Sequence, residues 1–237
     1  MSAQGPRLQA VGFFHRISFT MMRMWSCADI ADAVEQGLIL RAQELDAEHA
    51  VYGIDSCDEL SLHPVIEQAL RAAGYGVHRE QRYPADWRKR SLSEGERCDF
   101  VLTPPPGDRS LRLPEAKATL FDAPDAVELD DAFWLEVKVV SQFTREGANG
   151  QYASQLLSTV RQDVTKLAKD AGILHAGLLL LLFVRDHEVA EHDLRIWQDR
   201  CLERSLPIAA PCRRDVPIGD RMGHTMCAIA LYPVRHL

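Results

Sequence analysis

The chain has 237 residues, of which 46% are hydrophobic, so it can bury the core of one α/β domain with additions. Its 27 basic and 34 acidic residues give a formal net charge of −7, unlike the basic surface of a dedicated nucleic-acid-binding module, so any contact with DNA must be local. The most apolar run, residues 177–184, has the length of a buried strand and is too short to span a bilayer, so no membrane contact is expected.

Six cysteines occur without a C-x-x-C pair or a spacing typical of zinc ligands. They are interpreted as free thiols in a reducing, cytoplasmic environment. The apolar residues between 11 and 24 are interrupted by His15, Arg16 and Arg23, which argues against a signal peptide. Met21, Met22 and Met24 are candidate alternative starts, and under that hypothesis the first twenty residues are a dispensable or disordered extension.

The amino-terminal part of the chain predicts two helices and then two strands. The first helix spans Ser26 to Asp46, with Ser26 as its N-cap and an apolar stripe along one side. The second spans Ser61 to Ala73, and Gly74 ends it. The strands are predicted at Tyr75–Arg82 and Cys98–Thr103, and prolines follow both.

The remainder of the chain predicts a surface insertion followed by alternating strands and helices. The Pro- and Asp-rich insertion covers residues 107–131, and a Gly-containing loop covers residues 147–150. Strands are predicted at Ala132–Val140, Leu178–Arg185 and His224–Tyr232, and helices at Tyr152–Asp170 and Val189–Arg204, with a loop at residues 207–217. Five consecutive leucines indicate that the Leu178 strand is buried on both faces.

An acid and a lysine stand two residues apart within the third predicted strand. Side chains alternate along a strand, so Glu136 and Lys138 share one face, while Leu135, Val137 and Val139 point to the other. A second acid, Asp99, lies in the preceding predicted strand. If the two strands are neighbours, their carboxylates form a site for a divalent cation.

At these residues the chain resembles the PD-(D/E)xK nuclease superfamily, over roughly residues 55–185. The resemblance implies a restriction endonuclease-like α/β core, with a central mixed sheet of four to five strands flanked by helices. It implies an N-terminal extension and helix over residues 1–54 and a nuclease-like domain over 55–237, with an insertion at 104–131 and a C-terminal helix–strand addition. The family places an acid on the first core helix, an Asp on the second strand and E-x-K on the third, which correspond here to Glu59, Asp99, Glu136 and Lys138. Cys98 occupies the position of the family's proline.

The implied activity is hydrolysis of DNA phosphodiesters with Mg²⁺ or Mn²⁺. Magnesium prefers hard oxygen ligands. Asp99, Glu136 and the carbonyl of Val137 would supply them, and Glu59 would hold a second ion or its waters. Lys138 would orient the nucleophile or stabilise charge on the phosphate. The alternative is a member of the same fold that has lost catalysis and binds nucleic acid or protein. A homodimer or a partner protein is compatible with both.

Each site residue also has a structural interpretation. Glu136 and Lys138 could form a surface salt pair of less than roughly 1 kcal/mol. A rival E-x-K occurs at Glu115 to Lys117, and Glu67 is an alternative helix acid. Glu59 could instead complete a capping box with Ser56. On the helix after the third strand, Gln155 resembles a polar residue that some family members use near the metal, whereas Arg161 and Lys166 could meet phosphates; a solvated helix face is the alternative for these three.

Overall fold

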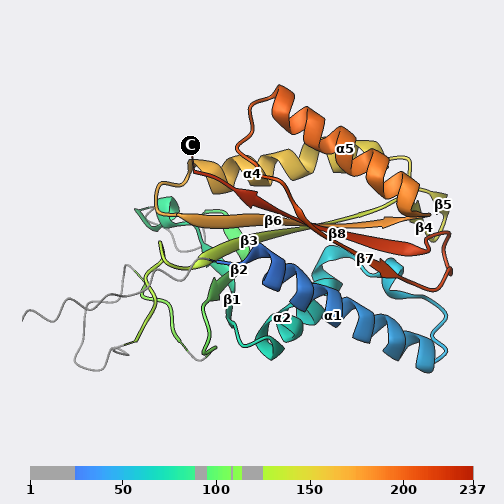
Figure 1. The fold of residues 1–237 in the computed structure, drawn as a ribbon, viewed down its shortest axis with the longest axis horizontal. Coiled ribbons are helices and arrows are strands. Elements are labelled where there is room, and N and C mark those ends of the chain that lie inside the picture. The colour runs from blue at the N-terminus through green and yellow to red at the C-terminus, as the bar shows by residue number, and fades with distance from the viewer. Residues whose placement is uncertain (1–24, 89–94, 108, 114–124, 237) are drawn as a thin grey trace, which may run out of the picture.

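The computed structural model describes residues 25–88, 95–107, 109–113 and 125–236 (Figure 1). Two predictions fall outside these residues and stay predictions. One is the extension over the first twenty residues, and the other is the rival E-x-K at Glu115 to Lys117.

A mixed six-stranded sheet forms the centre of the molecule, in the order β1-β2-β3-β6-β8-β7. Neighbouring strands are antiparallel except β3 and β6, which are parallel. The α/β class is therefore as predicted, but the sheet has six strands rather than four to five. The strands are β1 Gly76–Arg82, β2 Arg97–Thr103, β3 Phe133–Ser141, β6 His175–Val184, β7 Cys212–Pro217 and β8 Met226–Val234.

The unpredicted sixth strand, β7, lies at one edge of the sheet and pairs only with β8. The prediction of a loop over residues 207–217 was wrong for this part. Its sequence, Cys-Arg-Arg-Asp-Val-Pro, has three consecutive charged residues and little apolar alternation. An edge strand tolerates such residues because one side of it meets solvent, and charges there discourage pairing with other chains. A short hairpin also forms from β4 Phe143–Thr144 and β5 Gly147–Ala148, and β5 occupies the first half of the loop that was predicted at residues 147–150.

Helices cover both faces of the sheet (Figure 1). α1 Cys27–Ala47 and α2 Glu59–Ala72 lie on one face, and α4 Val160–Lys169 and α5 His187–Glu203 lie on the other. The leucines of β6 alternate between the two resulting cores, since Leu179 and Leu181 pack with α1 and α2, and Leu180 and Leu182 pack with α4 and α5. Burial of this strand on both faces is thus confirmed.

The first helix begins as predicted, because the Ser26 side chain accepts a hydrogen bond from the Asp29 N–H. The second begins differently from the capping box considered for Ser56. Asp58 is its N-cap and accepts from the Ser61 N–H at 2.8 Å. Glu59 is consequently the first residue of α2, and its carboxylate does not cap the N-terminus of the helix.

The helix predicted over Tyr152–Asp170 is interrupted. Its first turn is α3 Tyr152–Ser154, a π-helical turn covers Gln155–Thr159, and α4 begins at Val160. A π turn adds a residue to the helical repeat and therefore rotates the side chains that follow it. Apolar periodicity alone did not predict this change of phase.

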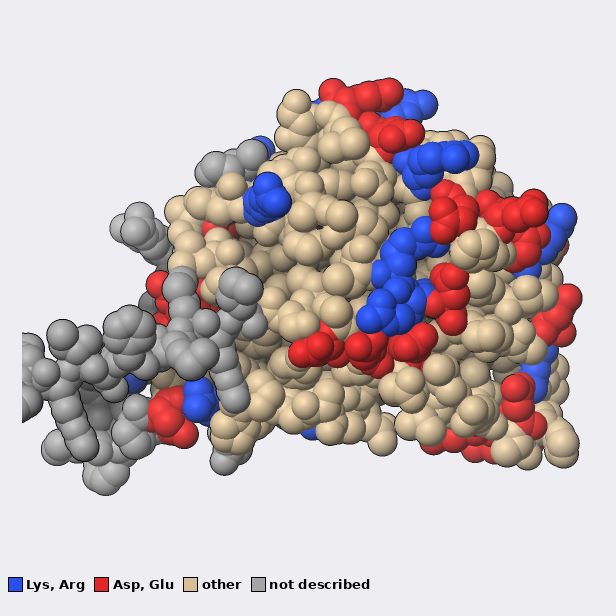
Figure 2. Space-filling view, in the orientation of Figure 1, with Lys and Arg blue, Asp and Glu red and all other residues tan. Residues whose placement is uncertain are grey.

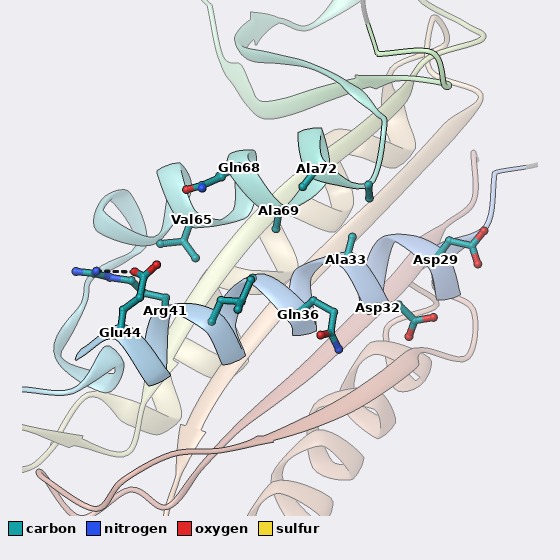
Figure 3. A pocket seen from close by; sticks show the side chains of 13 residues that line it. Asp29, Asp32, Ala33, Gln36, Arg41, Glu44, Val65, Gln68, Ala69 and Ala72 are labelled. Carbon is teal, nitrogen blue, oxygen red and sulfur yellow. Dashed lines mark hydrogen bonds and ion pairs between the residues drawn. The ribbon is translucent and has the colours of Figure 1, made fainter. Parts of the chain in front are cut away.

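A groove of about 550 Å³ runs between α1 and α2 on the outside of the molecule (Figure 3). The two helices approach closely at Gly37, where an added Cβ would lie 2.5 Å from the Cβ of Ala69. Leu40 and Val65 contribute apolar surface to the groove, and Asp29 lies at one end of it. α1, which belongs to the predicted N-terminal extension, therefore packs directly on α2 and also on β7.

Acidic and basic side chains alternate on the face shown in Figure 2, without a broad basic area. Ion pairs such as Arg214 with Asp32 and Arg213 with Glu191 join neighbouring elements. In the described ranges, no helix is both long enough and apolar enough to cross a membrane. All six cysteines are unpaired.

Candidate functional site

The candidate site lies where β2 and β3 separate. Their ladder pairs Leu102 with Phe133, Val101 with Trp134 and Phe100 with Leu135, and β3 then continues beside β6 alone. Two backbone N–H groups beyond this point take carboxylates as acceptors. Val137 N donates to Asp99 Oδ2 at 2.8 Å, and Val139 N donates to Glu59 Oε2 at 3.4 Å. Because buried N–H groups need acceptors, the separated strand edge holds both acids in place.

Glu136 is the most enclosed acid of this group. It is 4% exposed, shares a side-chain hydrogen bond with Asp99 and accepts another from the hydroxyl of Tyr83. Burial, together with the negative charge of Asp99, raises the pKa of Glu136 to about 9. Burial and the charge of Asp99 therefore favour the protonated form of Glu136 when no cation is bound. This carboxyl group does not belong to a surface salt pair, so the structural alternative for Glu136 was wrong.

Lys138 points to acids from two other elements. Its Nζ lies 3.0 Å from Glu59 Oε1 on α2 and 3.7 Å from Asp163 Oδ2 on α4. Burial acts to lower the pKa of Lys138, but Asp163 and Glu59 outweigh it and raise that pKa above its usual value. The ammonium group is therefore charged and joins the two layers of helices across the end of the β2–β3 ladder.

Asp163 is a site residue that the sequence analysis did not single out. Burial raises its pKa, and the nearby charges of Lys138 and Lys166 oppose that rise. A signal was present, because Asp163 follows Val160 by three residues and precedes Leu167 by four, which places an acid on the apolar stripe of the helix. Buried acids are rare without a partner.

The three predicted substrate contacts lie in different surroundings. Lys166 Nζ is 3.3 Å from Asp163 Oδ1 and 3.4 Å from Glu96 Oε1, so it adjoins the acids. Gln155, in the π turn, accepts a hydrogen bond from Asn149 Nδ2 at 3.1 Å. Arg161 lies near Cys201 of α5; burial raises the pKa of that thiol, and the Arg161 charge opposes the rise. Of the three, Lys166 is the one whose contacts reach the acids.

Two further predictions concern ligand atoms. Glu67, the alternative to Glu59, pairs with Arg71 at 2.9 Å and with Arg79 at 3.8 Å, whereas Glu59 contacts β3. The structure therefore brings Glu59, and not Glu67, to Lys138. The N–H of Val137 bonds Asp99, and the use of its carbonyl as a metal ligand stays a prediction.

A histidine stands beside these acids and was also missed. Ligand atoms of Glu59, His63 and Asp99 lie within 4.8 Å of one another, close enough to surround a metal ion. Like Asp163, His63 occupies an apolar stripe, that of α2 with Ile66 and Leu70, and it is buried. A polar residue within an apolar stripe was thus the sequence signal for both omissions.

A scan against protein-family models gave no match, and searches of curated proteins and of solved structures found no significant similarity either.

Proposed function

We propose that the protein is a divalent-cation-dependent phosphodiesterase that cleaves DNA and has a restriction endonuclease-like core. The observation that carries the proposal is the meeting of Asp99, Glu136 and Lys138, with Glu59, at the point where β2 leaves β3. The resemblance predicts this order along the chain. An acid lies on the first core helix, an Asp on the second strand and an acid–lysine pair on the third strand. The nuclease assignment rests on this arrangement.

The acids also suit a cation on physical grounds. Asp99 and Glu136 are close enough to share a proton, and burial makes two negative charges there unfavourable. A divalent cation could replace that proton and allow both groups to ionise. Carboxylate oxygens are ligands that Mg²⁺ and Mn²⁺ favour. Asp99, Glu136 and the Val137 carbonyl would hold the ion, and Glu59 would bind a second ion or its waters.

Each residue then has a definite part in hydrolysis. When bound, Mg²⁺ or Mn²⁺ would activate a water molecule and neutralise charge on the phosphate oxygens. Lys138, held by Glu59 and Asp163, directs a positive charge at the same place. Tyr83 fixes the Glu136 carboxyl through its hydroxyl. Lys166, which pairs with Asp163 at the edge of the acids, would meet a phosphate of the DNA.

The proposal is tested by cleavage of plasmid, linear and branched DNA with Mg²⁺ or Mn²⁺. The wild type should cleave, whereas Glu136→Ala and Lys138→Ala should be inactive; Glu44→Gln, an exposed acid on α1, is the matched control. Cleavage that survives both site substitutions would refute the assignment. Isothermal titration with Mn²⁺ adds a second measurement, in which Asp99→Asn should remove the binding heat of the wild type.

A second function uses the same fold without catalysis, as a module that binds nucleic acid or protein. The net charge of −7 and the interleaved charges of Figure 2 favour it, because neither suits tight nonspecific binding of DNA. Retention of DNA without cleavage under any of the cation conditions would select this function. The homodimer or partner protein stays a prediction in both cases.

A further inference from the structure

His63 is an enclosed imidazole with one nitrogen directed at the acids. Its side chain is 1% exposed, and its ring packs edge-on against Phe100 with 5.0 Å between ring centroids. Nε2 lies 3.9 Å from Asp99 Oδ1, beyond hydrogen-bonding distance. This buried nitrogen has no hydrogen-bond partner within the described part of the chain.

The other nitrogen defines the protonation state of the ring. Nδ1 of His63 lies 3.2 Å from Nη2 of Arg79. A guanidinium group only donates hydrogen bonds, so Nδ1 must be the acceptor and carries no proton. The imidazole is therefore neutral, and its single proton resides on Nε2, the nitrogen that faces Asp99.

Arg79 is itself fixed by its surroundings. Its guanidinium carbon lies 5.8 Å from the centre of the Phe100 ring, and Nη1 is 3.8 Å from Glu67 Oε2. Phe100 of β2 and Glu67 of α2 thus hold the donor that selects the tautomer of His63.

This hydrogen-bond pattern is the reverse of the one that a metal ligand needs. A histidine that binds a metal offers the lone pair of one nitrogen and usually donates the N–H of the other to a carboxylate or carbonyl. In His63 the nitrogen next to the acids bears the hydrogen, and the other nitrogen accepts. An N–H on the nitrogen that faces Asp99 disfavours a cation between His63 and Asp99, and leaves for the cation the side of Asp99 that adjoins Glu136.

We propose that His63 serves the site as a neutral hydrogen-bond donor, through Nε2–H, to an acceptor oxygen that enters beside the cation, and not as a metal ligand. The oxygen belongs to a water molecule or to a phosphate group. This role rests on the proposed function, because it presumes that a cation binds Asp99. It explains why a buried N–H lacks a partner in the protein itself.

The direct test is nitrogen-15 NMR of the imidazole rings, with the His63 signals assigned by their absence in His63→Gln. In the cation-free wild type, Nε2 should carry the proton and Nδ1 should accept, a result that does not depend on any activity. On addition of Mg²⁺ the Nε2 proton should remain. A shift of that proton with Mg²⁺ alone identifies a water as the acceptor, whereas a shift that also requires inorganic phosphate identifies a phosphate oxygen.

Two variants of His63 give a second measurement. The side-chain amide of Gln can donate from a place similar to Nε2, whereas Leu cannot donate. His63→Leu should lower the cleavage rate about 10- to 100-fold, and His63→Gln should stay within about threefold of the wild type. His78→Gln, which alters another half-buried imidazole on β1, is the matched control and should cleave like the wild type.

Arg79→Met keeps the imidazole and removes the donor to Nδ1. We expect the Nδ1–H tautomer to appear in this variant, which frees the Nε2 lone pair and increases the preference for Mn²⁺ over Mg²⁺. Loss of the Nε2 proton when Mg²⁺ binds the wild type would overturn the role of His63 alone. Absence of any cation binding would overturn the proposed function and this role with it.

Discussion

Replacement of Glu136 by Gln should make the cation-free protein more stable at alkaline pH than the wild type. The side-chain amide can still accept from Tyr83 and can donate to Asp99, which is the pattern of a protonated Glu136. The folded-state pKa of Glu136 is raised from 4.5 to about 9. Its contribution to stability is thus complete below pH 4.5 and is lost as the pH rises toward 9, since folding opposes ionisation.

The magnitude follows from linkage, at about 1.4 kcal/mol for each pH unit within that window. From pH 5 to pH 8 the wild type should lose on the order of 4 kcal/mol of unfolding free energy relative to Glu136→Gln. Urea unfolding followed by circular dichroism, in the presence of a chelator, measures this difference. The control Glu44→Gln removes a carboxyl group that is 61% exposed and should follow the wild type at each pH. Equal pH dependence of the wild type and Glu136→Gln would refute the buried, protonated state of Glu136.

Three further substitutions test the surroundings of the site and the packing of the helices. Tyr83→Phe removes the hydroxyl donor that lowers the pKa of Glu136, so the pKa of Glu136 should rise further. Mn²⁺ binding, followed by calorimetry, should then require a higher pH than in the wild type. An unchanged pH dependence of Mn²⁺ binding would contradict the hydrogen bond between Tyr83 and Glu136. Asp163→Asn removes a charge that raises the pKa of Lys138, and NMR titration of the lysine side chain should show a lower pKa, whereas no change would place Asp163 outside its influence. Gly37→Leu would place a side-chain carbon 2.5 Å from a side-chain carbon of α2, and the overpacking should cost about 1–3 kcal/mol in urea unfolding, unlike Gln36→Leu at the neighbouring exposed position of the same helix.

Strands and helices with a clear apolar period could be predicted from sequence. The run of leucines in β6 reflects burial on two faces, so local pattern was sufficient there. The alternation through β3 was sufficient to predict a strand, although residues 133–137 are in fact buried on both faces. Pattern failed for β7, because an edge strand can be charged, and for the π turn at Gln155–Thr159, because one added residue leaves most of the apolar period intact.

The sequence by itself determined which residue types were available, an acid on one strand and an acid with a lysine on the next. It also placed Glu136 and Lys138 on one face, because alternation along a strand is a local property. The tertiary structure decided which charges meet. The separation of β2 from β3 exposes N–H groups that bind Asp99 and Glu59, and packing brings in His63, Tyr83 and Asp163 from other elements. Such contacts depend on the spatial arrangement of segments that are distant in sequence, and no local periodicity encodes that arrangement.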